Sequence, residues 1–245
     1  MQALNFWNKF IIHRIKIILV FLLCLHTVAT EAQRFKWARA NNPNYDERTL
    51  SYGFMIGLHS SAYQIKYSDQ FVDANFDTVH SVLPPWSPGF SLGFLVNLRL
   101  NEVLDLRLMP KAGFYDHDLE YNYTDDSRQS QLIETTMVEF PILLKYKSMR
   151  RGNVRMYMVG GFTPSIEASG KNDAVSTTAN LDVKKANLTV DAGLGFDFYF
   201  PLFKFSQEIR FQRGVVNLLG SNASIYSDPL SRINTNTVSI YFIFQ

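Results

Sequence analysis

The chain has 245 residues, of which 47% are hydrophobic, 14% aromatic and 19% charged, and its formal net charge is +2. This length suits one large domain or two small ones. It contains no run of 18 or more apolar residues, which excludes a membrane-spanning helix, and its near-neutral charge gives no indication of nucleic-acid binding.

The first 32 residues have the pattern of a secretory signal peptide. Three Lys or Arg residues precede the apolar run IILVFLLCL at 17–25, which is too short to span a bilayer. Small residues at 30 and 32 predict signal cleavage between Ala32 and Gln33. The only cysteine, Cys24, lies in this segment, so the cleaved chain would have no disulfide or Cys-ligated metal. The alternative is a retained N-terminal anchor.

Residues 33–49 are polar, contain NNPNYDER and are predicted to form a flexible periplasmic lead-in. Beyond them, apolar and polar residues alternate with a period of two, which indicates strands with one apolar and one polar face. The predicted strands span 51–60, 89–100, 103–114, 132–147, 153–162, 188–200, 203–213 and 237–244. Most are close to the roughly 9–11 residues that a tilted strand needs to cross a bilayer.

The connections between these strands alternate in length. Short links are expected at 101–102, 148–153 and 201–202, and long polar links at 69–88, 115–131, 163–187 and 214–236. Outer-membrane barrels have this asymmetry, with tight periplasmic turns and longer extracellular loops. An even number of strands then places both termini on the periplasmic side.

In the stretch VEFPILLKYK at 138–147, apolar residues alternate with Glu139, Lys145 and Lys147. The strand therefore has an apolar face and a charged face, and the question is which of them points to the outside of a barrel. An Arg or Lys facing lipid at the bilayer midplane would cost about 2–4 kcal/mol, so the charged face is expected to point into a barrel. The charges expected inside are Asp105, Arg107, Lys111, Glu139, Lys145, Asp191, Asp197, Glu208 and Arg210.

The predicted fold is therefore all-β: an eight-stranded antiparallel transmembrane β-barrel over residues 50–245, in the outer membrane of a Gram-negative bacterium. A soluble eight-stranded barrel with the opposite face inside is the alternative. Pro110 and Pro141 interrupt predicted strands and cannot donate a ladder hydrogen bond, so we expect a bulge or local break near each.

The interior is expected to be structural. Eight strands leave a bore that side chains largely fill, and Tyr157 and Tyr199 would fill it further, so no direct conductance is expected. Arg150 and Arg151, in the turn before Gly152, are candidates for contact with a periplasmic partner, although a solvated basic turn is the alternative.

An enzyme is the competing class of function. His59 and the stretch YDHDLEY at 115–121 place histidines near the extracellular end, and Asp116 and Asp118 flank His117 as orienting groups or weak metal ligands. The alternative is a polar loop base above an aromatic girdle of tyrosines at 115, 121 and 123. No nucleophile-elbow serine or HExxH pattern occurs, and no cofactor or small-molecule substrate is expected.

Three stretches resemble the PorT family of outer-membrane barrels, which is associated with type IX secretion and gliding motility. They are LDLRLMPKAGFYDHDLEY (104–121), ETTMVEFPILLKYKSMRRGNVRMYMVGG (134–161) and GLGFDFYFPLFKFSQEIRFQRGVVNLL (193–219). The resemblance implies a non-enzymatic subunit that helps export proteins carrying a C-terminal sorting signal, with outer-membrane lipid and other type IX subunits as partners. It supplies no catalytic residues. A general small barrel with an adhesive or envelope-stabilising role is the alternative.

Overall fold

The computed structural model describes residues 41–72, 79–124, 127–168, 181, 183–220 and 227–245. The predicted signal peptide and its cleavage site at Ala32 and Gln33 lie outside these residues. No helix among the described residues is long and apolar enough to cross a membrane.

The described residues form two short 3-10 helices and eleven strands. These are η1 (Tyr45–Glu47), β1 (Leu50–Tyr67), η2 (Asp69–Val72), β2 (Val79–Leu83), β3 (Ser87–Arg99), β4 (Leu104–Leu108), β5 (Lys111–Tyr123), β6 (Arg128–Glu139), β7 (Ile142–Lys147), β8 (Val154–Glu167), β9 (Ala186–Tyr199), β10 (Lys204–Gly214) and β11 (Leu230–Phe244).

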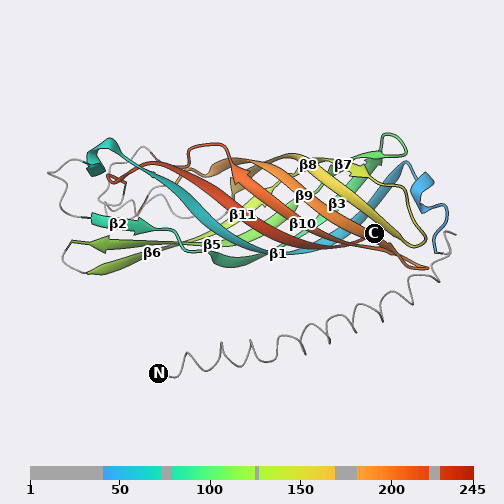
Figure 1. Ribbon diagram of the computed structural model, residues 1–245, viewed down its shortest axis with the longest axis horizontal. Coiled ribbons are helices and arrows are strands. Elements are labelled where there is room, and N and C mark those ends of the chain that lie inside the picture. The colour runs from blue at the N-terminus through green and yellow to red at the C-terminus, as the bar shows by residue number, and fades with distance from the viewer. Residues whose placement is uncertain (1–40, 73–78, 125–126, 169–180, 182, 221–226) are drawn as a thin grey trace, which may run out of the picture.

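Ten of these strands form one closed antiparallel ring with eight positions, as predicted (Figure 1). Strands β4 and β5 share one position, as do β6 and β7, so the order around the ring is β1, β3, β4/β5, β6/β7, β8, β9, β10 and β11. The first and last strands close the ring, with register partners from Phe54–Phe244 to Tyr67–Leu230. Strand β2 lies outside the ring and pairs with β5.

The two prolines break the strands without inserting a residue. Lys111 pairs with Glu139 and Leu108 with Ile142, so equal numbers of residues lie between these pairs on both sides and the register continues. The carbonyl of Pro110 accepts from the Phe94 amide at 3.0 Å, and that of Pro141 from the Met109 amide at 3.0 Å. Each proline therefore keeps its acceptor in the ladder and loses only its donor. The expected local breaks are present, and no bulge accompanies them.

The two ends of the barrel differ in their connections. Turns at 100–103, 148–153 and 200–203 define the short-turn end, and Gly152 has a φ of 61° that favours glycine in the middle turn. Connections at 68–86, 124–127, 168–185 and 215–229 define the long-loop end. The predicted loop at 115–131 is wrong in extent, because most of it belongs to β5 and β6, which project together at this end (Figure 1).

An apolar belt surrounds the half of the barrel nearer the short-turn end. It consists of large exposed side chains that alternate with inward polar ones, including Phe54, Ile56, Leu58, Leu92, Phe94, Leu106, Leu108, Leu144, Met158, Leu194, Phe196, Ile209, Phe211, Val238 and Ile240. This half, called the belt section below, has its charges inside and an apolar outer face, as the transmembrane prediction requires. Its interior also contains a small apolar cluster, which consists of Met55, Leu95, Met109, Leu143, Tyr241 and Ile243.

Beyond the belt the same strands reverse their polarity. Their inward side chains, together with side chains of β2 and of the long connections, form an apolar cluster, the loop-end core. Most of their outward side chains are polar, with Leu132 as an exception. The buried members of the core are Tyr63, Val79, Val82, Leu119, Tyr121, Leu181, Leu218, Leu230 and Ile233. Tyr115 is also buried inside, so an outer aromatic girdle formed by the tyrosines at 115 and 121 is wrong. The half that contains this core is called the loop-end section.

Candidate functional site: the charged interior of the barrel

The alternation of the strands brings all nine charges predicted from the sequence into the bore. Each is buried, and those that are 0% exposed include Arg107, Lys145, Glu208 and Arg210. They reach the interior from two walls of the ring, on strands β4 to β7 and on strands β9 and β10. They form several separate groups rather than one cluster.

The central group is built around Glu208 on β10. Its carboxylate accepts from Arg107 Nη1 at 2.7 Å, from the Tyr157 hydroxyl at 2.9 Å, and from the guanidinium of Arg210. Arg107 comes from β4 and Tyr157 from β8, so the group spans the bore. The Nε of Arg107 also donates to Asn97 Oδ1 at 2.8 Å. One carboxylate thus binds two guanidinium groups from different walls, the arrangement that a buried charge requires.

Asp191 continues this group toward the long-loop end. Its carboxylate accepts from Gln212 at 2.9 Å and from the hydroxyls of Thr163 and Thr189 at 2.8 Å each. Arg210 Nη1 lies 3.7 Å from the same carboxylate. Neutral donors therefore supply most of the hydrogen bonds that this buried anion needs.

Two Lys–Asp pairs lie nearer the short-turn end. Lys145 Nζ is 2.7 Å from Asp197, which also accepts from Ser206 at 2.5 Å. Lys147 Nζ is 2.5 Å from Asp105. Lys147 is absent from the predicted set, although it shares the inward parity of Lys145 two positions earlier. That parity is the signal that could have found it.

Lys111 and Glu139 form a further pair beside the proline break. Their Nζ–Oε2 distance is 2.9 Å, and their backbones are register partners in the β5–β6 ladder. The hydroxyl of Tyr115 donates to Glu139, and Lys111 Nζ lies 3.0 Å from the hydroxyl of Tyr241. Pro110 directly precedes Lys111, and Pro141 follows Glu139 by two positions, so both prolines lie close to this cross-strand ion pair.

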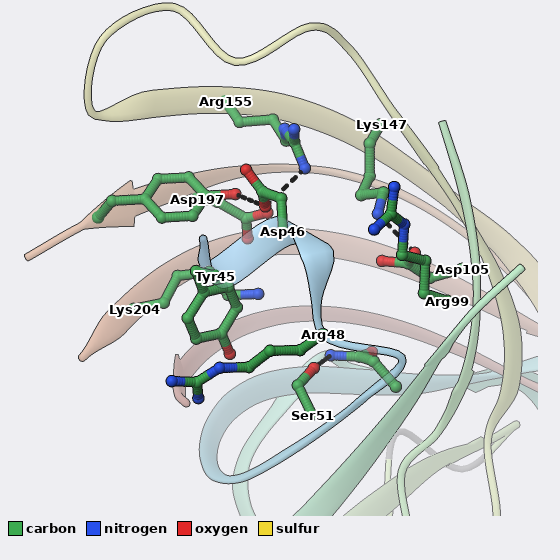
Figure 2. Close-up of a pocket in the computed structure, with 12 residues that line it drawn as sticks. Tyr45, Asp46, Arg48, Ser51, Arg99, Asp105, Lys147, Arg155, Asp197 and Lys204 are labelled. Atoms are coloured by element: carbon green, nitrogen blue, oxygen red, sulfur yellow. Dashed lines mark hydrogen bonds and ion pairs between the residues drawn. The ribbon is translucent and has the colours of Figure 1, made fainter. Parts of the chain in front are cut away.

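The described part of the lead-in, residues 41–49, covers the short-turn end of the barrel. Asp46 on η1 accepts from Arg155 Nη1 at 3.0 Å and from the Tyr199 hydroxyl at 2.7 Å, and Figure 2 shows it reaching toward Arg155. Tyr45 is buried beside it, and burial raises the pKa of Tyr45 to about 12. Residues 41–49 therefore have a fixed place, unlike the flexible segment expected from their polar composition. Residues 33–40 lie outside the described part of the chain.

Arg150 holds this lead-in in place. It is only 6% exposed, its Nη1 donates to the Asn42 carbonyl at 2.9 Å, and its Nη2 donates to the Asn41 carbonyl. Its guanidinium carbon lies 3.6 Å from the centroid of the Tyr199 ring. The structure thus gives Arg150 a role within the chain and leaves Arg151 exposed. Contact of these two residues with a periplasmic partner stays a prediction.

A polar hollow lies between the lead-in and the Lys–Asp pairs (Figure 2). Its empty space is about 310 Å³, part of which is open solvent, and its lining includes Arg99, Asp105, Lys147 and Lys204. Lys204 Nζ lies 4.6 Å from the centroid of Tyr45. The lining carries charges of both signs, most of them already paired, so the hollow suits water better than a charged ligand.

The candidate acid–base site at 115–121 separates into two faces. Because residues alternate along β5, His117 points into the barrel while the carboxylates of Asp116 and Asp118 lie on the outer face. His117 stacks on Tyr63 with ring centroids 4.2 Å apart, and neither of its ring nitrogens has a hydrogen-bond partner among the described residues. The flanking carboxylates therefore cannot orient this imidazole.

The buried side chains of the interior link the strands of the barrel wall to one another. Its largest fully buried side chains include Arg107, Arg210, Tyr157 and Tyr241, which occupy the bore of the belt section. Within the described residues, no three His, Cys, Asp or Glu side chains gather as a metal site. Ion pairs that join opposite walls hold the ring together and fill the space that a conducting channel would need.

A closed eight-position ring with a charged, filled interior and an apolar outer belt defines a small transmembrane β-barrel. The chain belongs to the outer membrane protein beta-barrel domain family, which matches residues 32–220. The barrel is therefore an outer-membrane protein. No curated protein sequence matches the chain.

Several solved structures are similar to this barrel. Neisserial surface protein A (NspA) is 10% identical, with 80% of this chain and 98% of that chain covered and a TM-score of 0.42. OprG from Pseudomonas aeruginosa is 12% identical, with 79% and 92% covered and a TM-score of 0.43. The N-terminal barrel domain of OprF from Pseudomonas aeruginosa is 10% identical, with 77% and 96% covered and a TM-score of 0.32.

Proposed function

We propose that this barrel is a non-enzymatic accessory subunit of the type IX protein secretion system, with a further role in gliding motility. The observation that carries the proposal is the resemblance of stretches 104–121, 134–161 and 193–219 to the PorT family, in the same order along the chain. Other type IX subunits are the proposed partners, and both termini lie in the periplasm.

The filled interior supports an accessory role rather than a translocating one. Ion pairs such as Arg107–Glu208 cross the bore at 2.7 Å, so a folded cargo protein has no path through the ring. In the proposed orientation, the lead-in covers the periplasmic mouth from below. Contact with a larger translocon would therefore use the outer wall, the turns or the loops.

The test compares a strain lacking this chain with its parent. We expect proteins with the C-terminal sorting signal to disappear from the culture medium and to accumulate in the periplasm. A plasmid copy of the wild-type chain should restore export. Unchanged export with intact levels of other outer-membrane proteins would contradict the secretion role.

A second candidate is a surface barrel that acts through its long loops in adhesion or envelope stability. The observation that favours it is the loop-end core, because a packed apolar interior beyond the belt makes a firm base for displayed loops. This role predicts normal export in the deletion strain, together with a loss of surface attachment or of resistance to detergent.

A further inference from the structure

The outer face of the barrel carries two groups of opposite charge just beyond the apolar belt. The basic sector lies on β1, β10 and β11 and consists of Lys66, Arg213 and Arg232, all exposed. The acidic sector lies on β5 and β6 and consists of Asp116, Asp118, Glu120 and Glu134. Strand β3 separates the sectors on one side of the ring, and β8 and β9 separate them on the other. These two groups of like charge therefore lie on opposite walls of the barrel.

The cations of the basic sector are held close together by the sheet. Lys66 and Arg232 are register partners in the β1–β11 ladder. Arg213 on β10 reaches across β11, and its Nη2 donates to Gln64 Oε1 on β1 at 3.0 Å. Like charges directly opposite each other across two strands are unfavourable unless an anion neutralises them.

The protein itself supplies no such anion among its described residues. Arg232 donates to two neutral oxygens, Asn234 Oδ1 at 2.7 Å and the Val215 carbonyl at 2.9 Å. Neither Lys66 nor Arg213 forms an ion pair with a carboxylate in the part of the chain that the structure describes. Inside the barrel, by contrast, cations such as Lys111 and Lys145 each meet a carboxylate within 3 Å.

The belt sets the height of the basic sector relative to a membrane. Arg213 follows Phe211 by two positions on the same face of β10, and Phe211 is a belt residue. Acyl chains that cover Phe211 would therefore place their headgroup phosphates beside Arg213, whose guanidinium contacts Gln64, two positions from Lys66 on β1. Arg and Lys near a membrane surface attract anionic headgroups, and a guanidinium binds phosphate through paired hydrogen bonds.

We propose that the basic sector binds the phosphate groups of a phosphorylated lipid in the leaflet at the long-loop end. The acidic sector repels the same headgroups, so the lipid binds to one wall of the barrel only. This site is independent of the secretion role, because it depends only on the membrane-embedded belt and on the charges beside it.

The first experiment measures lipid retention by native mass spectrometry of the purified barrel in dodecyl maltoside micelles. The probes are diphosphoryl lipid A, the same lipid with its phosphates removed, and zwitterionic phosphatidylcholine. We expect the diphosphoryl lipid to bind at least about tenfold more tightly than either of the others, because each cation near the surface contributes roughly a fivefold factor. Equal retention of the phosphorylated and dephosphorylated lipids would overturn the proposal.

The triple variant Lys66→Gln, Arg213→Gln and Arg232→Gln should lose this preference, with a fall in affinity on the order of a hundredfold. The matched control, Asp116→Asn with Glu134→Gln, changes charges on the opposite wall and should keep the full affinity. The conservative variant Arg213→Lys with Arg232→Lys separates charge from folding and should retain most of the binding. Wild-type affinity in a folded triple variant would exclude the basic sector as the site.

An added excess of inorganic phosphate distinguishes a lipid site from a site for soluble anions. Millimolar phosphate should leave lipid A bound, because the acyl chains on the belt supply part of the affinity. Displacement of the lipid at that concentration would show that the cations bind free phosphate equally well, and would contradict a lipid site.

Discussion

The belt section and the loop-end section are made from the same strands but are packed inside out relative to each other. On β5 the inward residue near the belt is Lys111 and the outward one is Phe114, whereas further along Leu119 points inward and Glu120 outward. The period of two continues without interruption. Only the polarity of its two faces changes, at about the level of Tyr115 and Asp116.

This reversal shows that the medium around the barrel determines the composition of both faces. Hydrocarbon outside the belt section requires apolar outward residues, and the charged groups are therefore confined to the bore, where they must pair with one another. Water outside the loop-end section permits an ordinary apolar core. The first section is therefore held together by ion pairs across the bore beside a small apolar cluster, and the second mainly by burial of hydrophobic side chains.

The largest expected effect comes from removing the central anion of the belt section. Glu208→Ala leaves Arg107 and Arg210 buried without their carboxylate, and breaking a buried pair in this way costs about 3–5 kcal/mol. Guanidinium unfolding of the barrel in phosphatidylcholine vesicles, followed by circular dichroism, measures the loss.

The adjacent Gln207 provides the control, because it lies on the outer face of the same strand. Gln207→Ala should change the free energy of unfolding by less than about 0.5 kcal/mol. Equal effects of the two substitutions would show that the interior charges do not hold the belt section together.

The next effect tests the other section. Leu119 is fully buried in the loop-end core, so Leu119→Ala should cost about 2–5 kcal/mol through lost burial and a cavity. Hydrogen exchange should locate the loosening in β2, β5 and β6, while the belt section stays protected. Leu144→Ala, on the outer face of the belt, is the matched control and should have a smaller effect without loosening the loop end. Loosening along the whole barrel after Leu119→Ala would mean that the sections are not separate units.

The sequence predicts the belt section well and the loop-end section poorly, for one physical reason. Alternation with charges on one face identifies a membrane strand, and this places the eight ring positions and all nine interior charges. Beyond the belt the alternation has the opposite polarity, so Asp116, Asp118 and Glu120 resemble a polar loop. A strand that leaves the membrane and continues in water gives no separate signal.

The pairing of the charges could not be predicted in the same way. Which cation meets which carboxylate depends on the register of strands far apart in the sequence, as for Arg107 and Glu208. Asp46 has no strand pattern at all, because it comes from the polar lead-in. Its role depends on the mouth of the closed ring, where Arg150, Arg155 and Tyr199 converge.

Replacing an exposed leucine by arginine in each section tests whether lipid or water surrounds it. Leu194 is 48% exposed at the middle of the belt, between Met158 and Ile209 on the neighbouring strands. Leu194→Arg should cost about 2–4 kcal/mol in vesicles, because the charge would face hydrocarbon. Leu132 is 59% exposed beyond the belt and faces Asp118 across the ladder, so Leu132→Arg should cost less than about 1 kcal/mol. Unfolding free energies in the same vesicles check both values, and a high cost at both sites would extend the belt to the loop end.

The smallest effect concerns how the bore of the belt section is filled. Two interior tyrosines each lie over a glycine on the neighbouring strand: Tyr157 over Gly195 and Tyr241 over Gly57. The missing side chains leave room for the rings, whose hydroxyls then reach the charged groups. In the loop-end core, by contrast, the buried Tyr63 and Tyr121 pack among Val, Leu and Ile side chains.

Gly195→Ala should therefore lower the unfolding free energy by about 1–3 kcal/mol, because its Cβ would lie 2.4 Å from Tyr157 Cζ and 2.8 Å from the Gln207 carbonyl oxygen. Gly160→Ala is the matched control on the outer face, where the nearest atom is the Asp191 carbonyl oxygen at 3.8 Å. It should be neutral or slightly stabilising, because the substitution restricts the unfolded chain without a clash. Addition of Tyr157→Ala should relieve part of the cost at Gly195 but not change Gly160→Ala. Equal effects of the two alanines would show that the position of the Tyr157 ring does not depend on Gly195. The bore would then have room for an added methyl group.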